Sequence, residues 1–203
     1  MAIGKARFIT LEGADGTGKS TQCRLLVEYL QKKGHQVITT HEPYGKLREI
    51  LLSQKWEPMS EALLMTAARI QHVAELILPA LQKGQWVVCD RFLDSTLAYQ
   101  GSARGLGIER MEALQEGILR PDLTLWLSLP VEISLRRLQE RKKEQNHNHF
   151  DLEPIAFHEK VAKGFSECAA RAAERFHIIN ADASEKEVWE RIEKIMRQFE
   201  EKK

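Results

Sequence analysis

The chain contains 203 residues, of which 43% are hydrophobic and 29% charged, and this composition is typical of a folded globular protein. Its 30 basic and 29 acidic side chains give a net charge of +1, which excludes attraction to nucleic acid or to an anionic membrane by overall charge. No apolar run approaches the roughly 18 residues of a membrane span, and the first residues do not resemble a signal peptide. We therefore expect a cytoplasmic protein without nucleic-acid or membrane partners. Cys23, Cys89 and Cys168 lack the paired spacing of a disulfide framework or a zinc site and are expected to be buried, reduced thiols.

Five short apolar runs alternate with helical patterns along the chain. Strands are predicted at 7–11, 36–40, 86–89, 123–129 and 176–179. Helices are predicted from about Gly18 onward and at 60–83, 108–119, 131–143, 154–175 and 184–200. Strands that are separated by helices form parallel sheets covered on both faces, so the pattern predicts an α/β fold with a central five-stranded parallel sheet flanked by helices. No repeat or linker divides the chain, and 1–203 is predicted to be a single domain.

Two segments depart from this regular alternation. Pro79 lies within a predicted helix, where it lacks an N–H group and its ring collides with the preceding turn, so a kink or a break is expected one turn earlier. The segment 139–149, Q-E-R-K-K-E-Q-N-H-N-H, is the least apolar part of the chain. It is either a solvated loop or a mobile lid whose cations meet phosphate groups.

The segment 13–20, G-A-D-G-T-G-K-S, fits the pattern G-x-x-x-x-G-K-[ST] of a phosphate-binding loop, between a predicted strand and a predicted helix. Glycines let the backbone wrap around phosphate oxygens, and the helix N-terminus adds a partial positive charge. Lys19 is expected to reach the β- and γ-phosphates, and the Ser20 hydroxyl is expected to bind Mg²⁺. The residues predicted to bind the nucleotide are Gly13, Ala14, Asp15, Gly16, Thr17, Gly18, Lys19, Ser20 and Thr21. The loop alone does not distinguish kinases from GTPases, ATPases or regulatory ATP-binding proteins.

The end of the third predicted strand narrows these alternatives. Its apolar run ends in Asp90, which is followed at once by Arg91. An aspartate beside a phosphate loop can hold Mg²⁺ through water, and an arginine can clamp a second phosphate group with two hydrogen bonds. This pair suits transfer between two phosphorylated molecules better than hydrolysis, although as a dipeptide it also fits a salt bridge at a strand end. The chain contains no N-K-x-D sequence of the kind that binds guanine.

Six segments together resemble the thymidylate kinase family of the bacterial type. They are F-I-T-L-E-G-A-D-G-T-G-K-S-T-Q at 8–22, H-E-P at 41–43, A-A-R-I-Q at 67–71, D-R-F-L-D-S-T-L-A-Y-Q-G at 90–101, P-D-L-T at 121–124 and F-H-E-K-V at 157–161. They follow one another in the family's order across nearly the whole chain, and the segment at 90–101 is highly specific to the family. The resemblance implies a P-loop NTPase-type fold with nucleoside monophosphate kinase architecture and a short lid at about 139–151. It also implies a homodimer that forms through helix packing.

The resemblance implies roles in base recognition for five residues. Arg69 resembles the arginine that reaches the thymine carbonyl edge, and Thr96 and Gln100 resemble the polar residues that bind the rest of the base. Tyr99 resembles the tyrosine beneath the deoxyribose, which would crowd a 2′-hydroxyl group. Met65 stands where relatives usually carry a phenylalanine that stacks on thymine. Because a thioether covers a base with less shape selectivity than a ring, we expect weaker thymine binding or a looser base preference.

A second set of residues is expected to meet the phosphate groups. Arg91 and Arg48 resemble the clamp of the acceptor phosphate, although the loop before Arg48 is several residues shorter than in relatives. Asp15 and Glu42 resemble acidic residues near the transferring phosphoryl group and its magnesium ion.

The cation that stabilises the transition state is expected to come from the lid. Gly16 occupies a position where some relatives carry an arginine, and His149 replaces an arginine that is common in family lids. Arg141 is therefore the first choice for this cation, and Arg137 is the second.

These observations predict a kinase that converts dTMP and ATP to dTDP and ADP in dTTP synthesis. The catalytic residues predicted are Lys19, Arg91, Arg141, Asp15 and Glu42, with ATP as donor and Mg²⁺ held near Ser20 and Asp90. Two alternatives stay open: a kinase for another nucleotide or nucleoside, and an inactive nucleotide-binding regulator.

Overall fold

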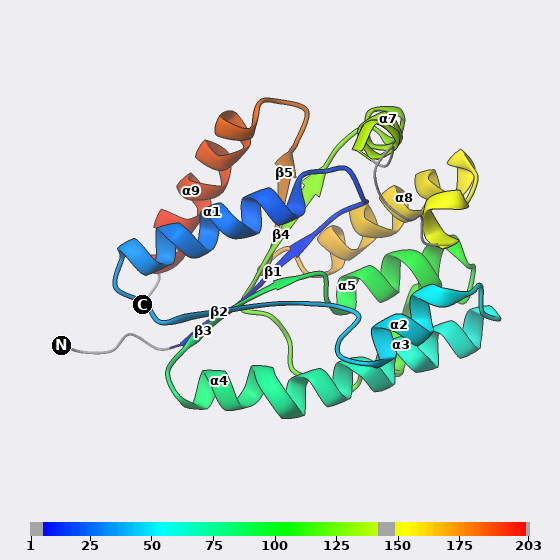
Figure 1. Cartoon of the computed structure of the whole chain (residues 1–203), viewed down its shortest axis with the longest axis horizontal. Coiled ribbons are helices and arrows are strands. Elements are labelled where there is room, and N and C mark those ends of the chain that lie inside the picture. Colours follow the sequence, from blue (N-terminus) through cyan, green and yellow to red (C-terminus); the bar gives the residue numbers. More distant parts are fainter. Residues whose placement is uncertain (1–5, 142–148, 202–203) are drawn as a thin grey trace.

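The computed structural model describes residues 6–141 and 149–201 (Figure 1). Its strands are β1 (Phe8–Glu12), β2 (Val37–His41), β3 (Trp86–Asp90), β4 (Leu123–Ser128) and β5 (Phe176–Asn180). They form a five-stranded sheet in the order β2-β3-β1-β4-β5, and every pair of neighbours is parallel. The predicted fold class is confirmed, and each strand end lies within one residue of its predicted position.

Helices connect the strands and cover both faces of the sheet. They are α1 (Lys19–Lys32), α2 (Leu47–Ser53), α3 (Pro58–His72), α4 (Leu78–Gln82), α5 (Leu93–Thr96), α6 (Ile108–Ala113), α7 (Val131–Arg141), α8 (Ile155–Arg171) and α9 (Glu185–Glu201). Two π-helical segments, η1 (Val73–Ile77) and η2 (Leu97–Ala103), and a short 3-10 helix, η4 (His149–Leu152), complete the set. Helices α1 and α9 cover one face, whereas α3, α4 and α8 lie on the other (Figure 1). None of the helices in the described ranges has both the length and the apolar character needed to cross a bilayer.

Strand β1 lies at the centre of the sheet and shows why both faces are apolar. All five of its side chains are buried. Because successive side chains of a strand point to opposite faces, Phe8 joins the core under α3 and α8, whereas Ile9 and Leu11 join the core under α1 and α9.

The order in which the chain adds strands to the sheet reverses next to β1. Strands β2 and β3 lie on one side of β1, and the chain then crosses to β4 and β5 on the other side. Open α/β sheets bind ligands at the carboxyl ends of strands at such a point.

The irregularity expected before Pro79 takes the form of a π-helical turn. Helix α3 begins at Pro58, and the Glu57 side chain accepts hydrogen bonds from the N–H groups of Met59 and Ser60. The chain then passes through η1 into α4, which contains Pro79 near its start. A π turn is wider than an α-helical turn, and proline is a common cause of such local changes. The helix is therefore widened one turn before the proline and continues beyond it.

Several helix boundaries differ from their predicted positions. Helix α2 and the α5–η2 segment form where no helix was predicted, because their short, mixed sequences become helical through tertiary packing. Helix α6 ends at Ala113 instead of 119, and the turn that follows includes Gly117 with a φ of 78°. Helix α8 ends at Arg171 instead of 175. Residues 142–143, the predicted end of α7, lie outside the described residues.

Helix α8 packs closely against η2 at Gly164. A Cβ atom on Gly164 would lie 2.7 Å from the Cα atom of Ala98 and 2.8 Å from the Cβ atom of Ser102. Both distances are shorter than normal contacts, and the nearer atom belongs to the backbone. The absence of a side chain at this position therefore sets the spacing between α8 and the segment that carries Tyr99 and Gln100.

We expect Gly164→Ala to lower the free energy of unfolding by roughly 1–3 kcal/mol, because the added methyl group overpacks this contact. The opposite sign is expected from helix propensity alone, since alanine is favoured over glycine within a helix by roughly 1 kcal/mol. Urea unfolding measures the change, and Lys163→Ala on the exposed side of the same helix is the control, with an expected change within about 0.5 kcal/mol. A stabilised Gly164→Ala protein would contradict the packing argument.

Candidate active site

The loop after β1 has the backbone shape of a phosphate cradle. Gly13, Gly16 and Gly18 have φ angles of 140°, 85° and 92°, which residues with side chains rarely adopt. A Cβ atom on Gly13 would lie 2.7 Å from the carbonyl oxygen of Leu127, and one on Gly16 would collide with the carbonyl oxygen of Ser134. The loop leads directly into α1, whose N-terminus favours a bound anion.

Lys19 and Asp15 bring two kinds of charge to this loop. The Lys19 ammonium group donates to the carbonyl oxygen of Ala14 at 2.9 Å and lies 3.6 Å from Asp15 Oδ1. Burial, followed by the charge of Arg91, lowers the pKa of Lys19, and the Asp15 and Asp90 carboxylates oppose this effect. Arg91 Nη2 donates to the same Asp15 oxygen at 2.8 Å. Asp15 therefore connects the lysine of the phosphate loop to the arginine that follows β3.

Ser20 and Asp90 form a group of oxygen atoms that fits Mg²⁺. The Ser20 hydroxyl donates to Asp90 Oδ2 at 3.3 Å, whereas Asp90 Oδ1 is buried and has no hydrogen-bond partner within the described part of the chain. Mg²⁺ in phosphate-transfer sites is held by one or two protein oxygens together with phosphates and water. The residues 6–141 and 149–201 contain no group of three or more His, Cys, Asp or Glu side chains that could form a complete metal cage. A magnesium ion at this place would therefore take its other ligands from phosphates and water.

The backbone that carries Arg91 adopts a strained conformation. Arg91 has a φ of 69°, in the left-handed region that residues other than glycine seldom occupy. Its N–H group donates to the carbonyl oxygen of Leu11 at 2.9 Å, and the next N–H group, of Phe92, donates to Glu12 Oε1 at 2.8 Å. The Ser95 hydroxyl donates to the other Glu12 oxygen at 2.6 Å. Strand β1 and Glu12 thus hold the turn that presents Arg91.

Glu12 is a buried site residue that the sequence analysis did not identify. Burial, followed by the charge of Asp94, raises the pKa of Glu12 to about 8, although Ser95, Arg91 and the Phe92 N–H group lower it in part. A glutamate at the end of an otherwise apolar strand, directly before the phosphate loop, is the signal that could have identified it.

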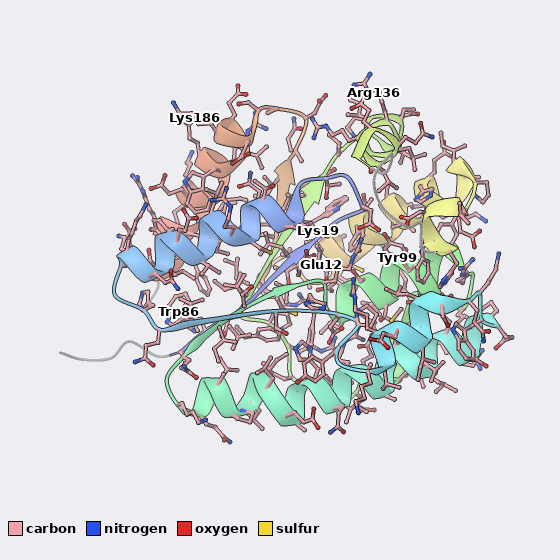
Figure 2. All side chains as sticks on the ribbon, viewed as in Figure 1. Glu12, Lys19, Trp86, Tyr99, Arg136 and Lys186 are labelled. Carbon is pink, nitrogen blue, oxygen red and sulfur yellow. The ribbon has the colours of Figure 1, made fainter. Side chains whose placement is uncertain are left out.

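A cavity of about 650 Å³ extends from the phosphate loop to α3 and η2. The predicted site residues that line it are Asp15, Gly16, Gly18, Lys19, Ser20, Glu42, Arg48, Met65, Arg69, Asp90, Arg91, Thr96, Tyr99 and Gln100. Figure 2 shows Glu12, Lys19 and Tyr99 near the centre of the molecule and Arg136 and Lys186 at its edge. The residues expected to bind phosphate and those expected to bind the base therefore share one cavity.

Arg69, in α3, is one of the residues that line this cavity. It is only 2% exposed, and its guanidinium group donates to Glu42 Oε2 through Nε at 2.8 Å and through Nη2 at 2.6 Å. Nη1 donates to the side chain of Gln115, and Nη2 also donates to the hydroxyl of Thr96 at 3.0 Å. Glu42 Oε1 lies 3.2 Å from His72 Nδ1. The Glu42 carboxylate thus holds Arg69. The role predicted for Glu42 beside the transferring phosphoryl group stays a prediction.

The remaining pocket residues surround Arg69 and Arg91. Arg48, in α2, donates from Nη1 to the carbonyl oxygen of Glu42 at 3.4 Å, so the short loop before it still brings it to the cavity. The ring of Tyr99 lies under the Arg91 guanidinium group, 5.2 Å from its centroid to Cζ. Met65 lines the same space from α3.

A further group of charged residues, Glu61, Arg104 and Glu153, lies behind Gln100 and was not predicted from the sequence. Gln100 Nε2 donates to Glu61 Oε1 at 2.7 Å. Glu61 is fully buried, and its carboxylate faces Arg104 and His149. Arg104 in turn pairs with Glu153 at 2.6 Å. These residues belong to separate segments, so their spacing along the sequence carried no motif.

Among the other predicted residues whose side chains the structure describes, Gly13, Ala14, Thr17, Thr21 and Arg137 do not line the cavity. Gly13, Ala14 and Thr17 belong to the phosphate loop and Thr21 to the first turn of α1. Arg137 lies in α7 and donates to the carbonyl oxygen of Ala181 at 3.4 Å. The side chain of Arg141, and residues 142–148 of the expected lid at 139–151, lie outside the described part of the structure. The functional roles of Arg137 and Arg141 stay predictions.

A cavity that runs from a phosphate loop past Arg91 to the buried polar groups around Arg69 and Gln100 fits the nucleoside monophosphate kinases, a class of P-loop proteins. The sequence model of the thymidylate kinase family matches residues 11–192. The chain is 47% identical to the thymidylate kinase of Alkalilimnicola ehrlichii over 188 residues, which cover 87% of this chain and 86% of the relative. It is 45% identical to that of a Synechococcus species over 91% of both chains, and 41% identical to that of Teredinibacter turnerae over 95% and 98%. The chain belongs to the thymidylate kinase family.

The raised pKa of Glu12 predicts a particular dependence of stability on pH. Between the ordinary glutamate pKa of about 4.5 and the raised value of about 8, the folded chain holds a proton that the unfolded chain has released. Stability contributed by protonated Glu12 is therefore lost as the pH rises through this window. We expect Glu12→Gln, which cannot ionise, to become more stable relative to the original protein from pH 5 to pH 8. Urea unfolding of both proteins at several pH values measures this difference, and a constant difference would show that Glu12 titrates normally.

Proposed function

We propose that this chain is a thymidylate kinase that transfers the γ-phosphate of ATP to dTMP and releases dTDP and ADP. The observation that supports the proposal best is the single cavity that joins the phosphate loop to the pocket of Arg69, Tyr99 and Gln100. An enzyme that hydrolyses ATP needs only the first part of this cavity. A kinase for a second nucleotide needs both parts, because it must hold two phosphorylated molecules in line.

In this proposal the phosphate loop and Lys19 bind the triphosphate of ATP. Ser20 and Asp90 would hold Mg²⁺, which supplies charge neutralisation on the phosphate oxygens when it is bound. Arg91 would clamp the phosphate of dTMP, and its ion pair with Asp15 keeps its side chain beside the loop. Proximity and alignment then supply most of the catalysis, since phosphoryl transfer needs little covalent participation by the protein.

The base and sugar of dTMP would occupy the second part of the cavity. Arg69 and Gln100 would bind the polar edge of thymine, with Thr96 holding the Arg69 guanidinium group at 3.0 Å. Tyr99 would pack beneath the deoxyribose, and Met65 would cover one face of the base. Arg48 would join Arg91 at the acceptor phosphate. We further propose that 1–203 acts as one domain whose lid, at about 139–151, delivers Arg141 or Arg137 to the phosphates.

We also propose that the protein acts in the cytoplasm. Cys23, Cys89 and Cys168 are free and buried, and free thiols suit a reducing compartment.

A homodimer is supported by an exposed apolar stripe along α3, η1 and α4. Its members are Leu63, Ala67, Ile70, Ala74 and Leu78, which recur at helical spacing on one side. Ile70 is 54% exposed and Leu63 is 50% exposed, while the two alanines allow a second helix to approach closely. We propose that a second copy of the chain covers this stripe.

The dimer proposal predicts that Ile70→Glu shifts the protein from dimer to monomer at micromolar concentration, because a charge would be buried in the interface. Sedimentation velocity measures the shift. Ile178→Glu is the matched control, because Ile178 is exposed on the edge strand β5 and lies outside the stripe. This variant should sediment like the original protein. Equal sedimentation of all three proteins as monomers would contradict the proposal.

The principal alternative is a kinase for another nucleotide, because Met65 offers less shape selectivity than an aromatic ring. Coupled detection of ADP with a panel of acceptors distinguishes a dTMP kinase from a kinase for another nucleotide. We expect dTMP to raise ADP formation by about a hundredfold or more over ATP alone, and to exceed dUMP, dCMP, dGMP and thymidine in kcat/KM. If another acceptor gave a higher kcat/KM than dTMP, that acceptor would take the place of dTMP as the proposed substrate. ADP release that does not depend on any acceptor would exclude a nucleotide kinase.

A further inference from the structure

The amide group of Gln100 has a fixed orientation in the cavity wall. Gln100 lies in η2, is 2% exposed and lines the cavity. Its nearest charged partner is Glu61, whose Oε1 atom lies 2.7 Å from Gln100 Nε2. An ionised carboxylate can only accept hydrogen bonds, so the NH₂ end of the amide must face Glu61. The carbonyl oxygen is then the end of the amide that is left for a ligand.

Glu61 is itself held by two further side chains, those of Arg104 and His149. It is fully buried, and Arg104 reaches its two oxygens from Nε and Nη2 at 3.4 Å each. His149 Nε2 lies 3.3 Å from Glu61 Oε2, and Arg104 Nη1 is fixed by Glu153 at 2.6 Å. A buried carboxylate that is paired in this way cannot turn from Gln100 without leaving a charge unpaired, which is costly. The Glu61 carboxylate therefore stays in place behind Gln100 as a hydrogen-bond acceptor.

We propose that Glu61 is a positioning residue that sets the base preference of the cavity through Gln100. This inference rests on the proposed function, in which the base of dTMP lies beside Gln100 and Arg69. The carbonyl oxygen of Gln100 accepts a hydrogen bond from N3–H of thymine, and the Arg69 guanidinium group donates to the carbonyl oxygen at C4 of thymine. Cytosine presents an acceptor at N3 and an amino group at C4, so both contacts become unfavourable. The buried contact between Glu61 and Gln100 thereby selects a pyrimidine that carries a proton on N3.

Glu61→Gln tests this inference, because a glutamine can face Gln100 with either end of its amide. Gln100 can then turn its NH₂ group toward the base. We expect the ratio of kcat/KM for dTMP to kcat/KM for 5-methyl-dCMP to fall by about tenfold or more. The two acceptors differ only at the N3 and C4 positions of the base, so the ratio reports hydrogen bonding and not fit. If Glu61 had only a structural role, Glu61→Gln would lower kcat/KM for dTMP and for 5-methyl-dCMP by the same factor.

Glu153→Gln is the matched control, because it also removes a carboxylate partner of Arg104 but does not touch Gln100. Its ratio should stay within about twofold of the original enzyme. An unchanged ratio in Glu61→Gln, or an equal fall in Glu153→Gln, would overturn the inference.

Gln100→Ala provides a second test that leaves Glu61 and its ion pairs in place, in case Glu61→Gln does not fold. The ratio should fall in this variant as well, because the positioned acceptor is gone. An unchanged ratio in Gln100→Ala would also overturn the inference. Failure of the proposed function looks different, since the original enzyme would then not turn over dTMP at all.

Discussion

The ion pair between Asp15 and Arg91 is the contact on which the site depends. It joins the phosphate loop to the turn after β3, and its 2.8 Å distance leaves Arg91 directly beside Lys19 and the loop backbone. The backbone of Arg91 adopts a left-handed conformation at this place. The cost of that conformation is offset by hydrogen bonds from the turn to β1 and to Glu12. The central strand therefore positions both the phosphate loop and Arg91.

Beyond this junction, the part of the cavity around Arg69 and Gln100 is built from charged and polar groups that hold one another. Glu42 fixes Arg69, and Glu61 fixes Gln100. Both carboxylates are nearly or fully inaccessible to water, so each needs its cationic partner in order to stay buried. The same pairing determines which hydrogen-bonding groups face a ligand. The contacts that keep these carboxylates buried therefore also fix Arg69 and Gln100, two of the polar groups that line the cavity.

The sequence predicted the sheet and the phosphate loop well because both depend on local patterns. Alternation of buried strands with helices determines the parallel sheet, and the glycine spacing determines the loop. The sequence did not predict Glu12, Glu61 or Arg104, because their importance arises from partners far away along the chain. Helix α2 and η2 were missed for a similar reason, since they are stabilised by packing and not by their own propensity. Arg69 and Gln100 were identified only through resemblance to a family, and their buried partners appeared only in the structure.

In the proposed kinase, one cavity would hold two phosphorylated molecules at once, with Arg91 between them. The most direct test is a crystal structure of the protein with a bisubstrate compound in which adenosine and thymidine are linked through five phosphates. Our expectation is that the phosphates next to adenosine lie on the loop around Lys19 and that the thymine lies within hydrogen-bond distance of Arg69 and Gln100. A thymidine end left in solvent, with the pocket beside Tyr99 closed, would contradict it.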